Sequence, residues 1–386
     1  MLKTFRYRLY PTVAQERKLL STLDLCRNLY NGALEERRSF YKKFNKSPTY
    51  FDQIKALSEV KELCPEYKDI HSQISQDVLR RLEKSYQNFF RRIKTGEKPG
   101  FPRFLSRDRY KSFTFPQSGF RIENDRLHLS KIGPVKISLH REILGKIKTC
   151  TIIKTSTNKW YCCFSTEVEK QALPKTWKMI GIDLGIKNFI TTSDGKTVAS
   201  KKFFNKHLER LALASRRHSK KRTHATKLHA ARVHEKVKSC RSDWQHKVAN
   251  RIVRENDIIA VEDLNIQKMK TSSKFGSGMK RHISDASWGQ LIFYLSYKAE
   301  YADKRVILVD PANTSKMCSR CGCVIKDLGL DVRIYRCEHC GLEMDRDHNA
   351  AINIKNLGLE IMKISNPKET RDIFSDREIK KPLALC

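Results

Sequence analysis

The chain has 386 residues, which is enough for two or three domains with buried cores. Its 77 Lys and Arg outnumber its 42 Asp and Glu, and the resulting net charge of +35 is spread along the chain, which indicates a polyanionic partner. It has no run of about 18 apolar residues, which argues against a membrane-spanning protein.

The cysteines have two possible explanations. Twelve of them would suit a secreted disulfide framework, but Met1-Leu-Lys-Thr-Phe-Arg-Tyr lacks the apolar segment of a signal peptide. We therefore expect a cytoplasmic protein in a reducing environment, with four Cys on zinc and most others acting as small buried hydrophobes.

The N-terminal third predicts one strand and then helices. Residues 2–10 alternate apolar and polar side chains, and Pro11 ends the run. Three apolar stripes at helical spacing follow: Leu19, Leu23, Cys26, Tyr30 and Ala33; Leu57, Val60 and Leu63, stopped by Pro65; and Ile74, Val78, Leu82, Tyr86, Phe89 and Ile93. A Gly- and Pro-rich loop, residues 96–103, ends the third helix.

The opposite face of the third helix is basic. A basic helix face is usually just solvated, but here Glu83 is the sole interspersed acid, so we expect phosphate contacts. The predicted contacts are Arg80, Arg81, Lys84, Arg91 and Arg92 on the helix, with Lys98 and Arg103 in the loop that follows.

From about residue 112 to 168 the period changes to two. Six short runs are predicted strands, and they begin at Phe113, Phe120, Arg126, Val135, Cys150 and Trp160. Turn signals such as Asn124-Asp125 and Asn158-Lys159 separate them. Six strands at this spacing predict a small barrel that residues 2–10 complete, so that the helices form an insertion.

A second unit is predicted from residue 177. Residues 179–183 form a buried strand, continued as a hairpin through Asp194-Gly195. Residues 201–250 form a very basic helical region, in which we expect phosphate contacts at Arg216, Arg217, Lys220, Lys221 and Arg222. Further predicted elements are strands at 257–263 and 305–310, a Gly/Ser/Lys loop at 270–280, an amphipathic helix at 288–299, a helix at 347–357 and a loose tail.

Four cysteines carry a metal signal. Cys318, Cys321, Cys337 and Cys340 follow the spacing C-x₂-C-x₁₅-C-x₂-C, which predicts one closed, structural, tetrahedral zinc site. Gly322 and Gly341 follow the second Cys of each pair, where a tight turn favours Gly. The alternatives are a disulfide or chance clustering, and Cys323 leaves open which thiol closes the first pair.

Three acids stand at informative places. Asp183 ends the first strand of the second unit, Glu262 ends a later strand and Asp347 opens the last helix. In a three-stranded antiparallel sheet extended by parallel strands these positions can meet, and three carboxylates around two Mg²⁺ ions suit phosphodiester hydrolysis. Singly, the acids have plain explanations as a turn, a solvated strand end and a helix cap, and Asp345 is a second candidate for the third position.

The run Ile180-Gly-Ile-Asp-Leu-Gly has a competing explanation. It is similar to the first phosphate-binding turn of sugar kinases and actin-like ATPases. That fold also needs a second Asp-x-Gly turn and a Gly-rich adenosine loop, neither of which is apparent between Glu262 and Asp310. The net charge also exceeds what a nucleotide alone requires.

Four segments together resemble the TnpB family, transposon-encoded nucleases related to type V CRISPR effectors. They are Gly181-Ile-Asp-Leu-Gly-Ile-Lys-Asn, Val261-Glu-Asp-Leu-Asn, Thr314-Ser-Lys-Met-Cys-Ser-Arg-Cys-Gly and Asp345-Arg-Asp-His-Asn-Ala-Ala-Ile-Asn. The likeness extends to Phe5-Arg-Tyr-Arg-Leu-Tyr-Pro-Thr and Lys98-Pro-Gly-Phe-Pro-Arg-Phe, so it covers most of the chain. It implies an RNA-guided DNA endonuclease of the prokaryotic cytosol or nucleoid, with a guide RNA from the transposon end and double-stranded target DNA as partners.

The resemblance also implies an α/β multidomain fold, which we divide as follows: a wedge β-barrel at 1–10 and 104–176; a helical recognition insert at 11–103; an RNase H-like, RuvC-type nuclease domain at 177–312 and 346–357; a zinc ribbon at 313–345; and a tail at 358–386. Asp183, Glu262 and Asp347 fall on the family's catalytic acids, and Asp347 is preferred over Asp345 because it holds the Asp-x-Asn-Ala-Ala spacing.

Three alternatives remain. A guided binder without cleavage is expected to lose at least one acid, and this chain keeps all three. An unguided RNase H-like resolvase or transposase explains the acids but leaves the helical insert and the barrel without a role. A non-catalytic zinc-ribbon DNA-binding protein leaves the acids themselves unexplained.

Overall fold

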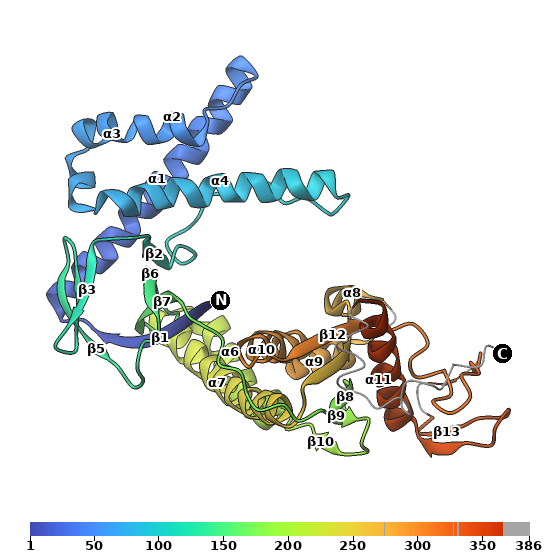
Figure 1. Ribbon diagram of the computed structural model, residues 1–386. Coiled ribbons are helices and arrows are strands. Elements are labelled where there is room, and N and C mark those ends of the chain that lie inside the picture. Colours follow the sequence, from blue (N-terminus) through green and yellow to red (C-terminus); the bar gives the residue numbers. More distant parts are fainter. Residues whose placement is uncertain (274, 327, 330–331, 366–386) are drawn as a thin grey trace. The chain divides into compact units, whose positions relative to one another are not determined.

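The computed structural model describes residues 1–273, 275–326, 328–329 and 332–365 (Figure 1). The chain forms two compact units, residues 1–169 and 170–386, and each is described by itself. No helix in the described part of the chain combines the length and the apolar character needed to cross a bilayer.

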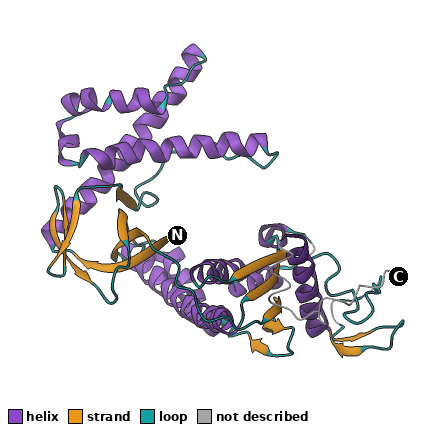
Figure 2. Ribbon diagram, viewed as in Figure 1, coloured by secondary structure: helices purple, strands orange, loops and turns teal. Residues whose placement is uncertain are grey.

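Strands and helices both contribute to the first unit, drawn in orange and purple in Figure 2. Seven strands of this unit pair in the order β2-β6-β7-β1-β5-β4-β3. They are β1 (Leu2–Tyr10), β2 (Ser112–Phe115), β3 (Phe120–Glu123), β4 (Arg126–Leu129), β5 (Gly133–Ser138), β6 (Lys146–Lys154) and β7 (Trp160–Glu167). Strand β1 lies in the middle, antiparallel to both β7 and β5. All seven predicted strands are confirmed. They form a nearly closed sheet, which is not a complete barrel because β2 and β3 are its two edge strands.

Alternation along these strands builds the core of the sheet. On β1 the side chains of Phe5, Tyr7 and Leu9 are buried, and on the paired strand β7 those of Trp160 and Phe164 are buried. Because successive side chains point to opposite faces, the intervening residues remain more exposed. The predicted turn at Asn124-Asp125 is confirmed, with both residues at positive φ.

The helices of the first unit follow β1 directly. They are α1 (Val13–Phe44), α2 (Tyr50–Lys55), α3 (Leu57–Leu63), the 3₁₀ helix η1 (Pro65–Asp69) and α4 (Ser72–Lys94). Helix α1 begins at a capping box between Thr12 and Gln15. It packs against the first half of α4, whose buried residues end at Leu82. The second half of α4 therefore extends beyond the packed core of its unit (Figure 1).

The second unit has a five-stranded sheet in the order β10-β9-β8-β11-β12. The strands are β8 (Met179–Asp183), β9 (Asn188–Thr192), β10 (Thr197–Ala199), β11 (Ile258–Glu262) and β12 (Arg305–Val309). Strands β8, β9 and β10 are antiparallel, whereas β11 runs parallel to both β8 and β12. This confirms the predicted antiparallel sheet extended by parallel strands.

Helices cover both faces of this sheet. Residues of α7 (His224–Glu255) and α10 (Trp288–Tyr301) form one core with alternate residues of β8 and β11 and with Phe189 and Ile190 of β9. Residues of α11 (Arg346–Ser365) form a second core with Met179, Ile258 and Ala260 on the other face. A Cβ atom at Gly181 would lie 2.1 Å from the carbonyl oxygen of Ala351, so only glycine lets α11 approach β8 this closely.

Three predictions for this unit need correction or refinement. The loop predicted at 270–280 is replaced in part by α8 (Ile266–Thr271) and α9 (Ser277–Ala286), short helices that lack a long apolar stripe. The basic region contains α5 (Phe203–Lys206) and α6 (Leu208–Lys221) before α7, with Arg222 in the left-handed conformation at the break. Residues 358–365, predicted as tail, belong to α11, which continues to Ser365; the rest of the predicted tail, residues 366–386, lies outside the described part.

Candidate functional site

Two strands and one helix bring the three predicted acids to one edge of the second sheet. Asp183 is the last residue of β8 and Glu262 the last of β11, and these strands are parallel with Val261 beside Ile182. Both acids therefore lie at the carboxyl ends of neighbouring strands. Asp347 lies in the first turn of α11, which packs on β8 where residue 181 is glycine.

The charges of these acids act on one another. Burial, together with the negative charges of Glu262 and Asp347, raises the pKa of Asp183 to about 8, against the opposing charge of Arg346. Burial also raises the pKa of Glu262. Asp183 therefore carries the repulsion of the other two carboxylates. Such a cluster favours a bound cation, which would relieve both the repulsion and the burial of charge.

Asp345 and Asp347 have different surroundings. The exposed carboxylate of Asp345 accepts a hydrogen bond from the backbone N–H of His348 at 3.0 Å, so it caps α11. Asp347 is half-buried, and burial and the charge of Asp345 raise its pKa, against Arg333, Arg346 and Lys187. The capping role considered for Asp347 thus belongs to Asp345.

The hydroxyl group of Thr314 orients the carboxylate of Glu262. Thr314 Oγ1 donates a hydrogen bond to Glu262 Oε1 at 2.5 Å, and both side chains are buried. This bond opposes the rise in the pKa of Glu262 that burial causes. Thr314 is the second residue of the zinc ribbon predicted at 313–345, so the segment that begins the ribbon also orients an acid of the cluster.

Two buried asparagines of α11 fix that segment. Asn353 Nδ2 donates to the carbonyl oxygens of Thr314 and Met317 at 2.8 and 2.6 Å. Asn349 Nδ2 donates to the Met317 carbonyl at 2.7 Å and its Oδ1 accepts from Ser319 N–H at 3.0 Å. Because these asparagines are four residues apart, they lie on one face of the helix. One helix therefore supplies Asp347 and anchors the chain that holds Glu262.

The four predicted zinc ligands lie together in the ribbon. Their sulfur atoms are all within 4.8 Å of one another, and the pairs Cys318–Cys340 and Cys321–Cys337 are 3.6 Å apart. A tetrahedron with Zn–S distances of about 2.3 Å has edges of about 3.8 Å, so this set could hold one zinc ion. A disulfide would need a separation near 2.05 Å, and the thiols are free.

The backbone around these thiols favours a metal as well. The N–H groups of Gly322 and Gly341 each donate at 2.9 Å to the carbonyl of the first Cys of their pair, and both glycines have positive φ, as predicted. Burial opposes ionisation of Cys318 and Cys337. It raises the pKa of the Cys318 thiol, whereas the backbone N–H groups of Cys340 and His339 lower the pKa of the Cys337 thiol. Strands β13 (Ile334–Arg336) and β14 (Glu343–Asp345) form a hairpin beside the four thiols.

The sequence leaves open whether Cys321 or Cys323 completes the first Cys pair of the zinc site. In the structure Cys323 belongs to a different group of possible ligands. Its sulfur, the Cys321 sulfur and a nitrogen of His339 all lie within 4.8 Å of one another. The four-thiol set therefore does not need Cys323.

The first unit carries an aromatic groove between α1, α2 and α4, with a volume of about 1100 Å³. Its walls include Tyr41, Phe51 and Phe90, which are 60%, 70% and 59% exposed, beside the cations of Arg38 and Arg80. Flat aromatic faces next to positive charge suit unpaired bases and phosphates. The second half of the predicted apolar stripe on α4 thus lines a groove, whereas its first half is core.

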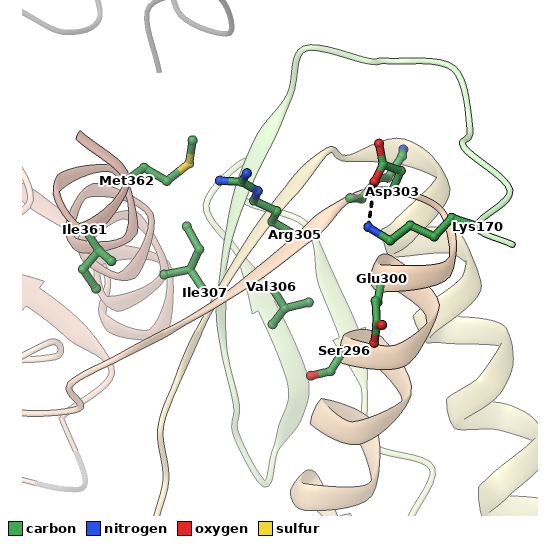
Figure 3. A pocket seen from close by; sticks show the side chains of 10 residues that line it. Lys170, Ser296, Glu300, Asp303, Arg305, Val306, Ile307, Ile361 and Met362 are labelled. Atoms are coloured by element: carbon green, nitrogen blue, oxygen red, sulfur yellow. Dashed lines mark hydrogen bonds and ion pairs between the residues drawn. The ribbon is translucent and has the colours of Figure 1, made fainter. Parts of the chain in front are cut away.

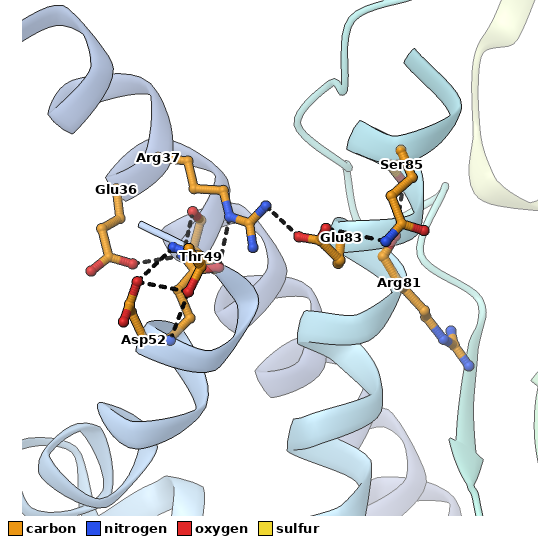
Figure 4. A network of polar contacts seen from close by, with 10 residues as sticks. Glu36, Arg37, Thr49, Asp52, Arg81, Glu83 and Ser85 are labelled. Carbon is orange, nitrogen blue, oxygen red and sulfur yellow. Dashed lines mark hydrogen bonds and ion pairs between the residues drawn. The ribbon is translucent and has the colours of Figure 1, made fainter. Parts of the chain in front are cut away.

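Hydrogen bonds and ion pairs of two arginines connect the elements around this groove (Figure 4). Arg37 of α1 is buried and donates to Gln53 at 2.9 Å and to Glu83 at 2.8 Å. Arg81 donates to Asp77 at 2.8 Å, to the Ser112 carbonyl at 2.8 Å and to Thr114 at 2.7 Å. These two arginines join α2 and β2 to the long helices.

Eleven of the twelve residues predicted to contact nucleic acid are exposed: Arg80, Lys84, Arg91, Arg92, Lys98, Arg103, Arg216, Arg217, Lys220, Lys221 and Arg222. Arg81 is half-buried and committed to the bonds given above. Arg91 and Arg92 share Glu97 as an ion-pair partner, at 2.8 and 3.9 Å.

A smaller hollow of about 460 Å³ lies beside the start of β12 (Figure 3). Lys170 and Asp303 form an ion pair of 3.1 Å at its edge, and Ile361 and Met362 of α11 line it. Arg305, Val306 and Ile307 line it from the amino end of β12, whereas Ile361 and Met362 belong to the carboxyl half of α11. The acid cluster lies at the opposite ends of both elements, so this hollow is not part of it.

Sequence reasoning missed the roles of Thr314, Asn349 and Asn353. All three stand inside motifs that were recognised, but nothing in their spacing says which carbonyl or carboxylate each one binds. The one sequence signal is that Asn349 and Asn353, which follow Asp347, are four residues apart. This spacing places both on one face of the helix, where they could bind another segment of the chain.

Comparisons with known proteins agree with these features. Three domain families match: "Helix-turn-helix domain" at residues 1–46, "Probable transposase" at 163–273 and "Cas12f1-like, TNB domain" at 288–354. In this chain residues 1–46 form one strand and one long helix rather than a helix-turn-helix.

The chain is 32% identical over 369 residues to a Streptomyces pristinaespiralis protein named "Putative RNA-guided DNA endonuclease", which covers 92% of this chain and 89% of the relative. It is 30% identical over 382 residues to "Putative RNA-guided DNA endonuclease InsQ" of Escherichia coli strain K12, with 94% and 93% covered. A solved Cas12f1–sgRNA–target DNA complex aligns with 92% of this chain and 99% of that chain at 18% identity, but with a TM-score of 0.37 it is too distant to support an inference.

Proposed function

This chain belongs to the TnpB family of transposon-associated RNA-guided DNA endonucleases, and we propose that it cuts DNA where Asp183, Glu262 and Asp347 converge. The observation that carries this proposal is the placement of the three acids at the carboxyl ends of β8 and β11 and in the first turn of α11, which packs on β8. Three acids from two neighbouring strands and a helix would serve no evident structural purpose, because their repulsion and burial oppose folding.

The donor set of this cluster fits Mg²⁺. Hard divalent cations prefer carboxylate oxygens. The pKa values of these carboxyl groups are raised, so a bound cation would stabilise their ionised forms. We assign Asp183, Glu262 and Asp347 as the residues that would hold two Mg²⁺ ions. When bound, such ions activate the attacking water and stabilise the leaving oxygen in phosphodiester hydrolysis.

The residues of the chain prepare this site. Burial and the neighbouring carboxylates raise the pKa of Asp183 to about 8, so Asp183 would lose its carboxyl proton to solvent if it were to hold a cation. Thr314 fixes one oxygen of Glu262, which leaves Oε2 for a ligand role. Asn349 and Asn353 keep the Thr314 segment against α11, and the Arg346 charge favours the ionised form of Asp183.

We assign the unit around the five-stranded sheet as an RNase H-like, RuvC-type nuclease domain at 177–312 and 346–357, interrupted by a zinc ribbon at 313–345. The nearly closed sheet at 1–10 and 104–176 would be the wedge barrel, and the helices at 11–103 its recognition insert. In this arrangement one structural Zn²⁺ on Cys318, Cys321, Cys337 and Cys340 stiffens the ribbon next to the acids.

The partners are a guide RNA and a target DNA. Base pairing between them would read the sequence, while the protein holds the backbones by charge and reads a short adjacent motif. The exposed cations of α4 and α6 supply that charge, and the aromatic groove of the first unit supplies stacking faces. An unguided resolvase would share the acids but would have no use for this groove.

Isosteric amides test the assignment of the acids. Asp183→Asn, Glu262→Gln and Asp347→Asn, each loaded with guide RNA, should lose DNA cleavage while still binding matched target, because the cations act on the transition state. Asp243→Asn is the matched control, since Asp243 is an exposed acid of α7 paired with Lys247. Normal cutting by any of the three site variants would remove that residue from the proposed site.

A further inference from the structure

A second group of side chains that could bind a metal shares Cys321 with the four-thiol set. Cys321, Cys323 and His339 each offer one ligand atom, and the three atoms lie within 4.8 Å of one another. Gly322, with φ at +82°, turns the chain between the two thiols. His339 stands between the two cysteines of the second pair, so each Cys pair contributes to this group.

Cys321 is common to both groups. Its sulfur lies 3.6 Å from that of Cys337 within the four-thiol set, and within 4.8 Å of the Cys323 sulfur and a His339 nitrogen. The position of Cys323 is fixed by the turn, since its carbonyl accepts the Cys318 N–H at 2.9 Å. The two ligand sets therefore share one ligand, the sulfur of Cys321.

The two groups differ in access to solvent. In the four-thiol set Cys318 and Cys337 are buried, which suits a closed structural site. In the second group Cys321 and Cys323 are half-buried and His339 is exposed. A cation on this side would be reached from solvent and would keep an open fourth position.

We propose that Cys321, Cys323 and His339 bind a second thiophilic d¹⁰ cation such as Zn²⁺ or Cd²⁺, with the Cys321 thiolate bridging it to the structural ion. A thiolate sulfur has lone pairs for two cations, and a set of two sulfurs and one imidazole selects soft or borderline metals. On binding, the Cys323 thiol releases its proton to solvent, and the neutral His339 ring coordinates through a nitrogen lone pair. Three protein ligands and one open position make this ion exchangeable, whereas the structural ion remains fixed.

Cadmium is the probe that tests this most directly. The full-length protein is dialysed against ¹¹³Cd²⁺, and bound metal is counted and its NMR spectrum recorded. We expect two ions per chain and two resonances that split each other, because a shared thiolate transmits scalar coupling between the two nuclei. Cys323→Ser should bind a single ion whose resonance is unsplit, and His339→Asn should bind the second ion more weakly.

Cys240→Ser is the matched control, because Cys240 is a half-buried thiol of the same unit outside both groups, and it should leave both resonances in place. One ion in the unaltered protein, or two uncoupled ions, would overturn the shared site. So would a Cys323→Ser variant that still binds two coupled ions, or one that binds none. Metal content and coupling are measured without cleavage, so these outcomes do not depend on the proposed nuclease function.

Discussion

The hydroxyl of Thr314 donates a hydrogen bond to Oε1 of Glu262 at 2.5 Å, and this bond joins the segment that begins the zinc ribbon to the end of a central strand. The two residues are 52 positions apart in the sequence, and both are buried. The bond explains how a ribbon that does no chemistry can still control the acid cluster.

The first prediction follows from that bond. Thr314→Val keeps the shape of the side chain but removes the hydroxyl, so Glu262 loses the partner that orients it. Cleavage should fall about 10- to 100-fold and need more Mg²⁺ for half-maximal rate. Thr314→Ser keeps the hydroxyl and should stay near the original values. An unchanged Mg²⁺ dependence in Thr314→Val would show that the bond does not orient a ligand.

The second prediction separates the two acids at the start of α11. Asp345→Ala removes a helix cap and should lower the free energy of unfolding by about 1 kcal/mol while cleavage persists. Asp347→Ala should abolish cleavage without loss of stability, because it removes a half-buried charge. Denaturant unfolding and plasmid cleavage measure both properties on the same preparations. If Asp345→Ala cannot cut and Asp347→Ala can, the two roles are reversed.

The third prediction concerns pH. Partial burial of Asp257 opposes its ionisation. The carboxylate accepts hydrogen bonds from the N–H groups of Trp177 and Thr176 and pairs with buried Lys304 at 3.2 Å. Together these contacts lower the pKa of Asp257. A lowered pKa in the folded state means that the ionised form stabilises the fold above the ordinary value of about 3.9. This contribution is lost as pH falls through the lower folded value.

Asp257→Asn leaves Lys304 buried without its counter-charge, so near pH 7 it should lower the free energy of unfolding by about 3 kcal/mol. The difference between this variant and the unaltered protein should shrink as pH drops below about 4, because Asp257 of the unfolded chain then takes up a proton while the folded chain stays ionised until pH passes its own lower pKa. Urea unfolding from pH 7 to pH 3 measures it. A gap that stays constant over this range would mean that the charge of Asp257 contributes nothing.

The fourth prediction distinguishes surface cations from a structural one. Replacing Arg216, Arg217, Lys220, Lys221 and Arg222 by Gln should weaken nucleic-acid binding for all sequences and reduce the salt slope by about one unit per lost phosphate contact. Arg81→Ala should instead destabilise the first unit by about 1–2 kcal/mol, since it loses its bonds to Asp77, Ser112 and Thr114. A changed sequence preference with an unaltered salt slope would contradict phosphate contact by the five cations.

Much of this structure could be predicted from local pattern. The strands that end in Asp183 and Glu262 are continuous apolar runs bounded by acids, and parallel strands buried on both faces produce such runs. The zinc ligands could be predicted because their spacing is itself the signal. Helices α8 and α9 could not, because they are short and lie in a stretch rich in Gly, Ser and Lys.

Partners across long sequence separations explain the remaining misses. Arg80 and Arg81 are neighbours in the sequence, and nothing in the sequence distinguishes them. Only the fold shows that Arg81 bonds to β2, whereas Arg80 is exposed to solvent. Tyr86, Phe89 and Ile93 continue a helical stripe that periodicity assigns to the core, yet none of the three is buried in the structure. Periodicity identifies an apolar face but does not identify what covers it.

The measurement that tests the central claim most directly is cleavage with and without a guide. The protein is stripped of RNA and offered a plasmid library with varied sequence beside one target, in the presence of Mg²⁺. It should cut nothing until a transcript of the transposon end fused to a target-matching segment is added. It should then cut at the matched site only, and the Asp183→Asn variant should bind there without cutting. Site-specific cutting by the RNA-free protein would contradict guided cleavage and favour an unguided resolvase.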